Sequence, residues 1–378
     1  MRGNGNQYAL NVASPSGVDV VHVKGVTLLN PNVADDLHQL RLMLGRATEM
    51  VTSLPSVAFY TRGGETSVAR LIAEGLRGHG AEQTVVYTAE NNNHAAEILA
   101  RDVQSVSSGG SGQRPVQALN TVIGKMSQVI SEPSEIERRG LEPIAPGFPR
   151  AFLVESFNRI LVSQIHLPGF DPGIAAFEGK EDLLPFEEAK LYGHNAAHTM
   201  LGFLGKTHEL LLLSDLRSKP ALIALVRKAF LCEAGEALIA RHGKLGDPLF
   251  TREGFRMYAD DLLLRMTNPH LSDTVARAIR DPVRKLGYSD RLFGAMRLCL
   301  TCGIEPECLA VGALTGLYAL SEHPERPQVP AFNVCRRDRK LTGSEIANLL
   351  AALWADGYSS AELKEIAEWV ERAQSSLL

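Results

Sequence analysis

The sequence predicts an α/β domain followed by a mostly all-α domain. In the first part, short β-branched segments alternate with segments of helical periodicity, which is the pattern of a parallel α/β sheet. From about Pro185 onward, nearly every segment is an amphipathic helix with short breaks. We therefore expect two domains, residues 1–183 and 184–378, a division that suits a chain of 378 residues.

The expected elements of the first domain follow from apolar periodicity and turn residues. Two β-branched segments, residues 8–12 and 18–28, are separated by a Pro/Ser/Gly turn and predict a strand pair. A third apolar segment, residues 56–64, predicts a strand that ends in Gly63 and Gly64. The other expected elements are helices at 33–52, 66–80 and 93–103, and strands at 83–91 and within 116–130 and 152–166.

Composition excludes several classes of protein. The formal net charge of −4 offers no strongly basic surface for nucleic acid or for an anionic membrane. Apolar runs such as residues 210–213 are far shorter than the roughly 18 residues of a membrane-spanning helix, and the first residues lack the apolar core of a secretory signal. Five cysteines are an odd, sparse set for a long chain, which fits a reducing compartment. We expect a soluble cytoplasmic protein without nucleic-acid or membrane partners.

A polar cluster interrupts an apolar, small-residue helix pattern between Glu187 and Gly205. Its members are Lys190, His194, Asn195 and His198. At about 100° per residue, these four side chains share an arc of about 140° on one side of a helix. Two interpretations are open, a partly exposed polar face or a site. Solvated helix faces favour Glu and Lys over His and Asn, and small residues surround the cluster, so we favour a site.

Two patterns in the chain resemble metal sites. His194 and His198 stand four residues apart, like half of a zinc site, but Asn195 stands where a zinc protease has its catalytic Glu. The three cysteines within residues 299–308 resemble a metal knuckle, but no second pair follows them. Buried structural cysteines are the favoured interpretation. We therefore assign no metal ligands.

Lys190 is the better candidate for chemistry. Burial and neighbouring positive charges lower the pKa of a lysine, so that it can act as a base near neutral pH. Asn195 and Asn91 can donate hydrogen bonds to a developing oxyanion. Asn91 is expected at the carboxyl end of a strand, where open α/β sheets place their ligands, although asparagine is also common in turns.

Lys190, Asn195 and His198 are spaced K-x4-N-x2-H, which resembles the signature of the polyol-specific long-chain dehydrogenases, the mannitol dehydrogenase family. YTAENNNHA at 87–95 and VESFNRILV at 154–162 are similar to two further motifs of that family. The segment RMTNPHLSDTVARAIRDPVRKLGYSDRL at 265–292 is similar to a helical block of its phosphate-substrate branch. The resemblance spans most of residues 19–320 and is nearest the mannitol-1-phosphate 5-dehydrogenase branch.

The resemblance implies a zinc-independent hydride transfer between NAD and a polyol or polyol phosphate. It implies Lys190 as the general base, and His198 as the residue that orients a neighbouring substrate hydroxyl. Asn91 and Asn195 are implied as donors to the oxyanion. The remaining assignments are Arg277 and Lys285 for substrate binding, and Gly63, Gly64 and Glu90 for cofactor binding.

Members of this family begin with a strand and a glycine-rich turn that places a pyrophosphate at a helix N-terminus. No strand expected in this chain is followed by G-x-G-x-x-G, so we expect a Rossmann-like domain that is incomplete at its N-terminus. Two hypotheses stay open: an NAD-dependent polyol dehydrogenase, or a catalytically silent descendant that binds sugar phosphates without a working cofactor site. The exact polyol, the choice between NAD and NADP, and the oligomeric state also stay open.

Overall fold

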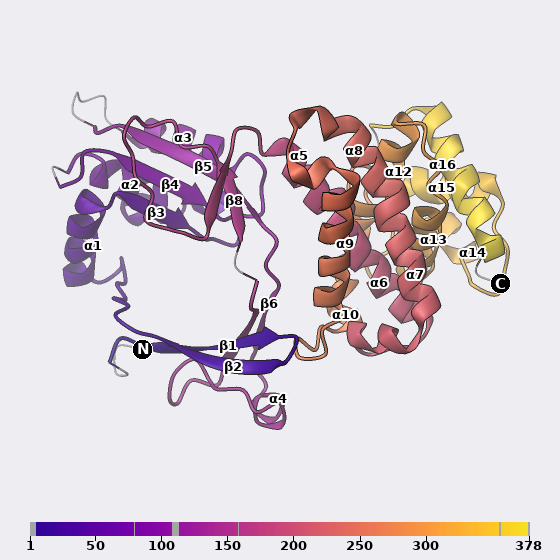
Figure 1. Cartoon of the computed structure of the whole chain (residues 1–378), viewed down its shortest axis with the longest axis horizontal. Helices are drawn as coiled ribbons and strands as arrows, with labels where there is room; N and C mark the ends of the chain where they lie inside the picture. The colour runs from indigo at the N-terminus through magenta and orange to yellow at the C-terminus, as the bar shows by residue number, and fades with distance from the viewer. Residues whose placement is uncertain (1–4, 79, 108–112, 158, 355–356, 377–378) are drawn as a thin grey trace. The chain divides into compact units, whose positions relative to one another are not determined.

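The computed structural model describes residues 5–78, 80–107, 113–157, 159–354 and 357–376 (Figure 1). The chain divides into two compact units, Met1–Glu187 and Glu188–Leu378. The first unit contains strands and helices, and the described part of the second contains helices and connecting segments without a named strand. This confirms the predicted fold class.

A five-stranded sheet forms one part of the first unit. Its elements along the chain are α1 (Ala34–Arg46), β3 (Glu49–Thr52), α2 (Val68–Gly75), β4 (Thr84–Thr88), α3 (Ala95–Val106), β5 (Val116–Ile123), β8 (Ile160–Ser163) and β9 (Phe177–Lys180). The strand order is β3-β4-β5-β8-β9, in which β3, β4 and β5 are parallel and β8 runs antiparallel to β5. Because α2 and α3 connect the parallel strands, this is the strand–helix alternation that the sequence predicts.

Apolar side chains cover both faces of this sheet. On one face, Val86 of β4 packs in a cluster with residues of α2 and α3. On the other face, Tyr87 packs with Leu119 of β5 and Val162 of β8. Successive residues of a strand point to opposite faces, so β4 is buried along its whole length, as expected for an interior parallel strand.

A second, four-stranded sheet also belongs to the first unit (Figure 1). It consists of β1 (Tyr8–Ser14), β2 (Gly17–Val23), β6 (Ser127–Ile130) and β7 (Ala151–Glu155), in the order β2-β1-β7-β6. β1 and β2 form an antiparallel hairpin, which confirms the predicted strand pair. The strands expected within 116–130 and 152–166 are present, but each segment contributes one strand to each sheet.

The prediction of a strand at 56–64 is wrong. The strand that precedes α2 is β3, which lies inside the range where periodicity predicted a single helix, 33–52. Residues Val57–Phe59 and Gly64–Thr66 form short 3-10 turns instead. Tyr60 is fully buried in the cluster with α2 and α3. The apolar character of this segment therefore comes from a turn that packs into the core, which a short apolar run does not distinguish from a strand.

The described part of the second unit is helical. Its elements, with α5 crossing the unit boundary, are α5 (Leu184–Glu188), a π-helical segment (Ala189–Asn195), α6 (Ala196–Thr207), α7 (Pro220–Lys228), a second π-helical segment (Ala229–Gly235), α8 (Glu236–His242), α9 (Arg252–Met266), α10 (Val275–Ala278), α11 (Pro282–Lys285), α12 (Arg291–Thr301), α13 (Glu307–Ser321), α14 (Pro330–Val334), α15 (Gly343–Trp354) and α16 (Ser360–Ala373). Every residue from Cys308 to Leu320 of α13 is buried. A helix that is apolar on all sides belongs in a core, and α13 packs against α6, α12 and α16.

Candidate active site

Lys190, Asn195 and His198 lie on one continuous helical stretch, but this stretch is not a uniform α-helix. Lys190 and Asn195 lie in the π-helical segment, and His198 lies in the first turn of α6. The i→i+5 bonding of a π-helix widens the turn and changes the angle between successive side chains. The 100° spacing used to place the cluster on one arc therefore applies only from Ala196 onward. Single π-helical turns inside α-helices are frequent at functional sites.

The wide turn packs against the second π-helical segment. Gly193 is buried, and a Cβ at this position would lie 2.7 Å from Cε2 of Phe230. Phe230 belongs to the second π-helical segment. Only a residue without a side chain leaves room for the ring at this position, so this glycine brings the two wide turns into contact.

Asp273 connects His198 to Arg277. Nε2 of His198 lies 2.8 Å from Oδ2 of Asp273. Arg277 approaches the same carboxylate with two donors, Nε at 2.7 Å from Oδ1 and Nη2 at 3.0 Å from Oδ2. The side chain of Asp273 is only 2% exposed. The three side chains therefore form one hydrogen-bonded group in which the carboxylate is shared.

The carboxylate of Asp273 is ionised throughout the physiological range. Burial alone would raise its pKa, but the hydrogen bonds from His198 and Arg277 outweigh burial and lower the pKa to about 2. An ionised carboxylate can only accept hydrogen bonds, so Nε2 of His198 carries the hydrogen that is shared with Asp273. In the neutral imidazole, this assignment leaves Nδ1 as an acceptor.

His194 is the most buried member of the polar cluster, with 8% of the residue exposed. Burial holds its pKa well below the usual value, and positive neighbours, including His198 and Lys190, lower it further. The imidazole is therefore neutral near pH 7. The electrostatic effect of both side chains on His194 indicates that the cluster is close in space as well as in sequence.

The two basic residues predicted to bind substrate differ in their surroundings. Arg277 is about one-third exposed and holds Asp273. Lys285 is 5% exposed, and its Nζ donates to the backbone oxygen of Ala278 at 2.7 Å. Burial lowers the pKa of Lys285 to about 7, with a further contribution from the positive charge of Arg291. Their role in substrate binding stays a prediction.

Sequence reasoning did not single out Asp273 or Arg291. Arg291 opens α12, and its Nη1 donates to Thr199 at 2.8 Å, next to His198 in the chain. Its buried Nε makes no hydrogen bond with any described residue, and burial lowers its pKa to about 10. A signal for Asp273 was present, because an acidic residue four positions before Arg277 is the spacing of a helical ion pair. No comparable signal pointed to Arg291.

The residues assigned to the cofactor lie in the first unit, in segments that follow β3 and β4. Gly63 and Gly64 are exposed and have φ angles of +100° and +58°, which favour glycine. Glu90 is buried and accepts hydrogen bonds from Thr52 at 2.8 Å and from Tyr60 at 2.5 Å. Through these hydrogen bonds, Glu90 connects the end of β3 and the turns that follow it to the end of β4. Cofactor binding by these three residues stays a prediction.

Asn91, the predicted oxyanion donor of the first unit, is exposed and follows β4 directly after Glu90. This is the carboxyl end of an interior parallel strand, as the sequence predicted. Its role as an oxyanion donor stays a prediction.

Among the described residues, no three His, Cys, Asp or Glu side chains are grouped so that they could hold a metal ion. The cysteines at 299 and 308 are buried, and burial raises the pKa of the Cys308 thiol to about 12. None of the helices in the described residues is both long and apolar enough to span a membrane.

Residues 182–377 match the family described as the mannitol dehydrogenase C-terminal domain. The chain belongs to the mannitol dehydrogenase family. The matched range contains the whole helical stretch of Lys190, Asn195 and His198, as well as Asp273 and Arg277. The family assignment that the spacing of Lys190, Asn195 and His198 suggested is therefore confirmed.

This mannitol dehydrogenase family member is 31% identical over 259 residues to the mannitol-1-phosphate 5-dehydrogenase of Pseudarthrobacter chlorophenolicus. The alignment covers 68% of this chain and 61% of that relative. The chain thus spans less than two thirds of the length of the curated relative.

Two solved structures have a similar fold. One is Pseudomonas fluorescens mannitol 2-dehydrogenase in a ternary complex with NAD and D-mannitol, with a TM-score of 0.64 and 14% identity over 100% of this chain and 81% of that one. The other is D-sorbitol dehydrogenase in substrate-free form, with a TM-score of 0.71 and 16% identity over 100% of this chain and 82% of that one. At these identities the similarity concerns the fold.

Proposed function

We propose that the chain is an oxidoreductase that transfers a hydride between NAD(H) and a polyol or polyol phosphate of the mannitol 1-phosphate and fructose 6-phosphate type. The observation that carries the proposal is the arrangement of Lys190, Asn195 and His198 on one helical stretch, with His198 held by Asp273. The family assignment and the mannitol-1-phosphate 5-dehydrogenase relative support the substrate class. A relative in fold that binds NAD and D-mannitol supports the cofactor.

Each residue then has a defined task. NAD, when bound, supplies the acceptor of the hydride. Lys190 acts as the general base and accepts the proton of the reacting hydroxyl. Asn195, and Asn91 from the first unit, donate hydrogen bonds to the oxygen as it becomes negative, an interaction that contributes several kcal/mol in a preorganised site. His198 accepts a hydrogen bond from a neighbouring hydroxyl through Nδ1, because Asp273 occupies Nε2.

Positive charge near this cluster supports recognition of a phosphate. Lys285 and Arg291 interact electrostatically, and Arg291 contacts the residue that follows His198. Burial makes these charges costly in the absence of an anion, and a phosphate would offset that cost through charge-assisted hydrogen bonds. Arg277 would then serve both the substrate and Asp273.

The parallel order of β3, β4 and β5 supports the cofactor part of the proposal. Open parallel sheets bind ligands at the carboxyl ends of their strands, and Gly63, Gly64 and Asn91 are exposed in the segments that follow β3 and β4. A Cβ on Gly64 would meet no atom within 4 Å. The backbone here is therefore open to a ligand.

The experiment that tests the proposal is a fluorescence titration of the purified chain with NADH, with and without fructose 6-phosphate. Saturable binding that responds to fructose 6-phosphate, followed by oxidation of NADH, is the expected result. The silent descendant predicts the opposite pattern, in which NADH does not bind while fructose 6-phosphate still raises the melting temperature. That pattern would overturn the enzymatic proposal.

A further inference from the structure

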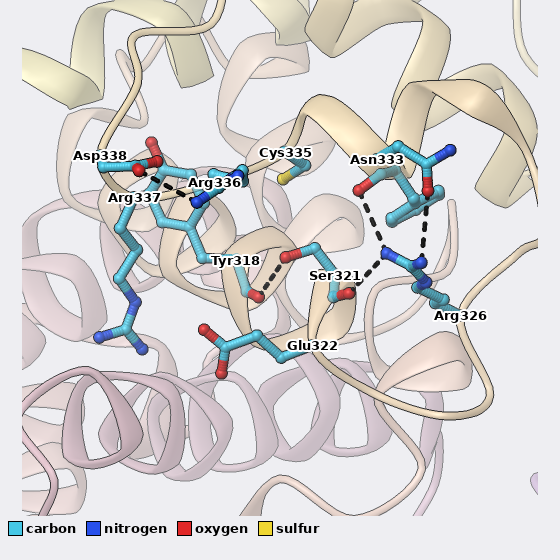
Figure 2. A pocket seen from close by; sticks show the side chains of 10 residues that line it. Tyr318, Ser321, Glu322, Arg326, Asn333, Cys335, Arg336, Arg337 and Asp338 are labelled. Atoms are coloured by element: carbon cyan, nitrogen blue, oxygen red, sulfur yellow. Dashed lines mark hydrogen bonds and ion pairs between the residues drawn. The ribbon is translucent and has the colours of Figure 1, made fainter.

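A cavity of about 450 Å³ lies in the helical unit at the C-terminal end of α13. Its volume is in the range of sites for small molecules. The lining residues come from the end of α13, from α14 and from the segments around α14 (Figure 2). Lys190, Asn195, His198, Arg277 and Lys285 are not among them. The cavity is therefore separate from the residues of the proposed active site.

Part of the cavity lining is apolar and buried. Phe332 and Cys335 are each 1% exposed, and Tyr318 is 6% exposed. Burial raises the pKa of the Cys335 thiol to about 12, so this thiol is neutral and adds to the apolar surface. Such a surface accommodates the carbon part of a small molecule.

Arg326 forms one side of the cavity in a fixed geometry. Its Nη1 donates to the backbone oxygen of Ser321 at 2.9 Å, and its Nη2 donates to Oδ1 of Asn333 at 3.3 Å. Figure 2 shows Arg326 and Asn333 together on one side and Arg336, Arg337 and Asp338 on the other. These hydrogen bonds hold the guanidinium group of Arg326 in place, and it contributes positive charge to this side of the cavity.

Arg336 and Arg337 can rearrange at little cost. The ion pair of Arg336 with Asp338 spans 3.2 Å, and the side chains are 69% and 68% exposed. Exposed pairs of this kind contribute little to stability. Arg337 donates from Nη1 to the backbone oxygen of Thr207, at the end of α6, across 3.1 Å in an exposed contact. Both guanidinium groups can therefore turn toward a ligand in the cavity.

We propose that this cavity binds a small organic phosphate, with the phosphate group held by Arg336 and Arg337. The cavity lining contains three arginines and two carboxylates, Glu322 and Asp338. Nζ of Lys206 lies 3.7 Å from Oε2 of Glu322 and adds a further positive charge. The balance of charge is positive, which favours an anion. Two guanidinium forks match the oxygens and the charge of a phosphate dianion, while the apolar surface contacts the carbon part.

The test is isothermal titration calorimetry of the full chain with glycerol 3-phosphate, and with glycerol as the uncharged control. Because each arginine supplies charge-assisted hydrogen bonds, Arg336→Ala and Arg337→Ala should each raise Kd about tenfold or more. Arg339→Ala is the matched control, because Arg339 lies in the same segment, pairs with Glu345 and does not line the cavity. Its Kd should equal that of the wild type, and glycerol should not bind.

The active-site variant Arg277→Ala separates this cavity from the proposed catalytic site. The component of glycerol 3-phosphate binding that Arg336→Ala and Arg337→Ala weaken should be unchanged in Arg277→Ala. Loss of binding in Arg277→Ala, with no change in Arg336→Ala and Arg337→Ala, would place the phosphate at the catalytic site and overturn the cavity proposal while leaving the proposed function intact. Absence of binding to the wild type, or an equal loss in Arg339→Ala, would also overturn it. If Arg337→Ala fails to fold, the result for Arg336→Ala decides the outcome. Arg336→Ala should fold normally, because it removes only an exposed ion pair.

Discussion

Nε2 of His198 lies 2.8 Å from Oδ2 of Asp273, a carboxylate that is almost completely buried. This contact fixes the imidazole ring and places its hydrogen on the side of Asp273. Because Arg277 holds the same carboxylate with two hydrogen bonds, rotation of Asp273 would break several interactions at once. Asp273 is therefore a positioning residue that acts through His198.

The first prediction concerns Asp273→Asn. An amide can donate a hydrogen bond to Nε2, which reverses the tautomer of His198 and makes Nδ1 a donor. We expect kcat/KM for mannitol 1-phosphate to fall about tenfold to hundredfold, with the fold retained by circular dichroism. Asp261→Asn is the control, because Asp261 is exposed and forms an ion pair with the nearby Arg265. Equal activity of the two variants would show that Asp273 does not position His198 for catalysis.

The second prediction concerns acid stability. The pKa of Asp273 is lowered to about 2 by its hydrogen bonds, whereas the unfolded chain titrates near its ordinary value of about 3.9. A depressed pKa contributes stability that is present above about pH 4 and is lost as the pH falls toward about 2, in all about 2–3 kcal/mol. Urea denaturation of wild type and Asp273→Asn should therefore differ more at pH 6 than at pH 2.5. A difference that does not depend on pH would contradict the ion-pair account.

The third prediction concerns Lys190→Ala. If Lys190 accepts the proton of the hydroxyl, its removal should lower kcat by about a thousandfold or more, since general-base catalysis contributes about 10²–10⁴. The melting temperature should change little, because Lys190 lies partly exposed in the wide turn. Thermal unfolding and steady-state kinetics check the two parts separately. A variant that fails to fold would show that Lys190 is structural.

Local periodicity was sufficient to predict the strand–helix alternation, the β1–β2 hairpin and the helical second unit. It failed where distant parts of the chain decide the local structure. Tyr60 enters the core from a 3-10 turn because Glu90 accepts its hydroxyl hydrogen, and no local pattern of residues 56–64 contains that information. The division of four strands between two sheets likewise depends on long-range pairing with β1.

The candidate site shows the same limit. The residue types and spacing of Lys190, Asn195 and His198 were visible in the sequence, but the wide turn that carries two of them was not. That turn packs against Phe230 through Gly193, a contact between helices far apart in the chain. Asp273 was within reach of sequence reasoning, because its spacing to Arg277 is that of a helical ion pair.

The fourth prediction concerns the buried residue Glu233 of the second π-helical segment. Its carboxylate accepts the backbone N–H groups of Cys308 and Leu309 at 2.7 and 2.8 Å and thus caps α13. Glu233→Ala leaves two buried donors without partners, and we expect a loss of about 2–4 kcal/mol in the free energy of unfolding. Glu307→Ala is the matched control, because Glu307 lies in the same first turn but is 57% exposed. Chemical denaturation should show a change below about 0.5 kcal/mol for it. Similar losses in both variants would argue against a capping role.

The fifth prediction uses the pKa of Lys285, which burial lowers to about 7. Above pH 7 the free protein loses this positive charge, so recognition of a phosphate should weaken as the pH rises toward 9. The ratio of kcat/KM for mannitol 1-phosphate to that for mannitol isolates the effect, because the ionisation of Lys190 affects both substrates equally. The phosphate itself is fully ionised in this range, since its second pKa is about 6.

The ratio should fall severalfold or more between pH 7 and 9 in the wild type. Lys285→Arg keeps its charge throughout this range and should hold the ratio constant, whereas Lys285→Met should make it low at every pH. A wild-type ratio that does not depend on pH, together with an unchanged ratio in Lys285→Met, would show that Lys285 contributes only its hydrogen bond to Ala278. Phosphate recognition would then be assigned to Arg277 and Arg291.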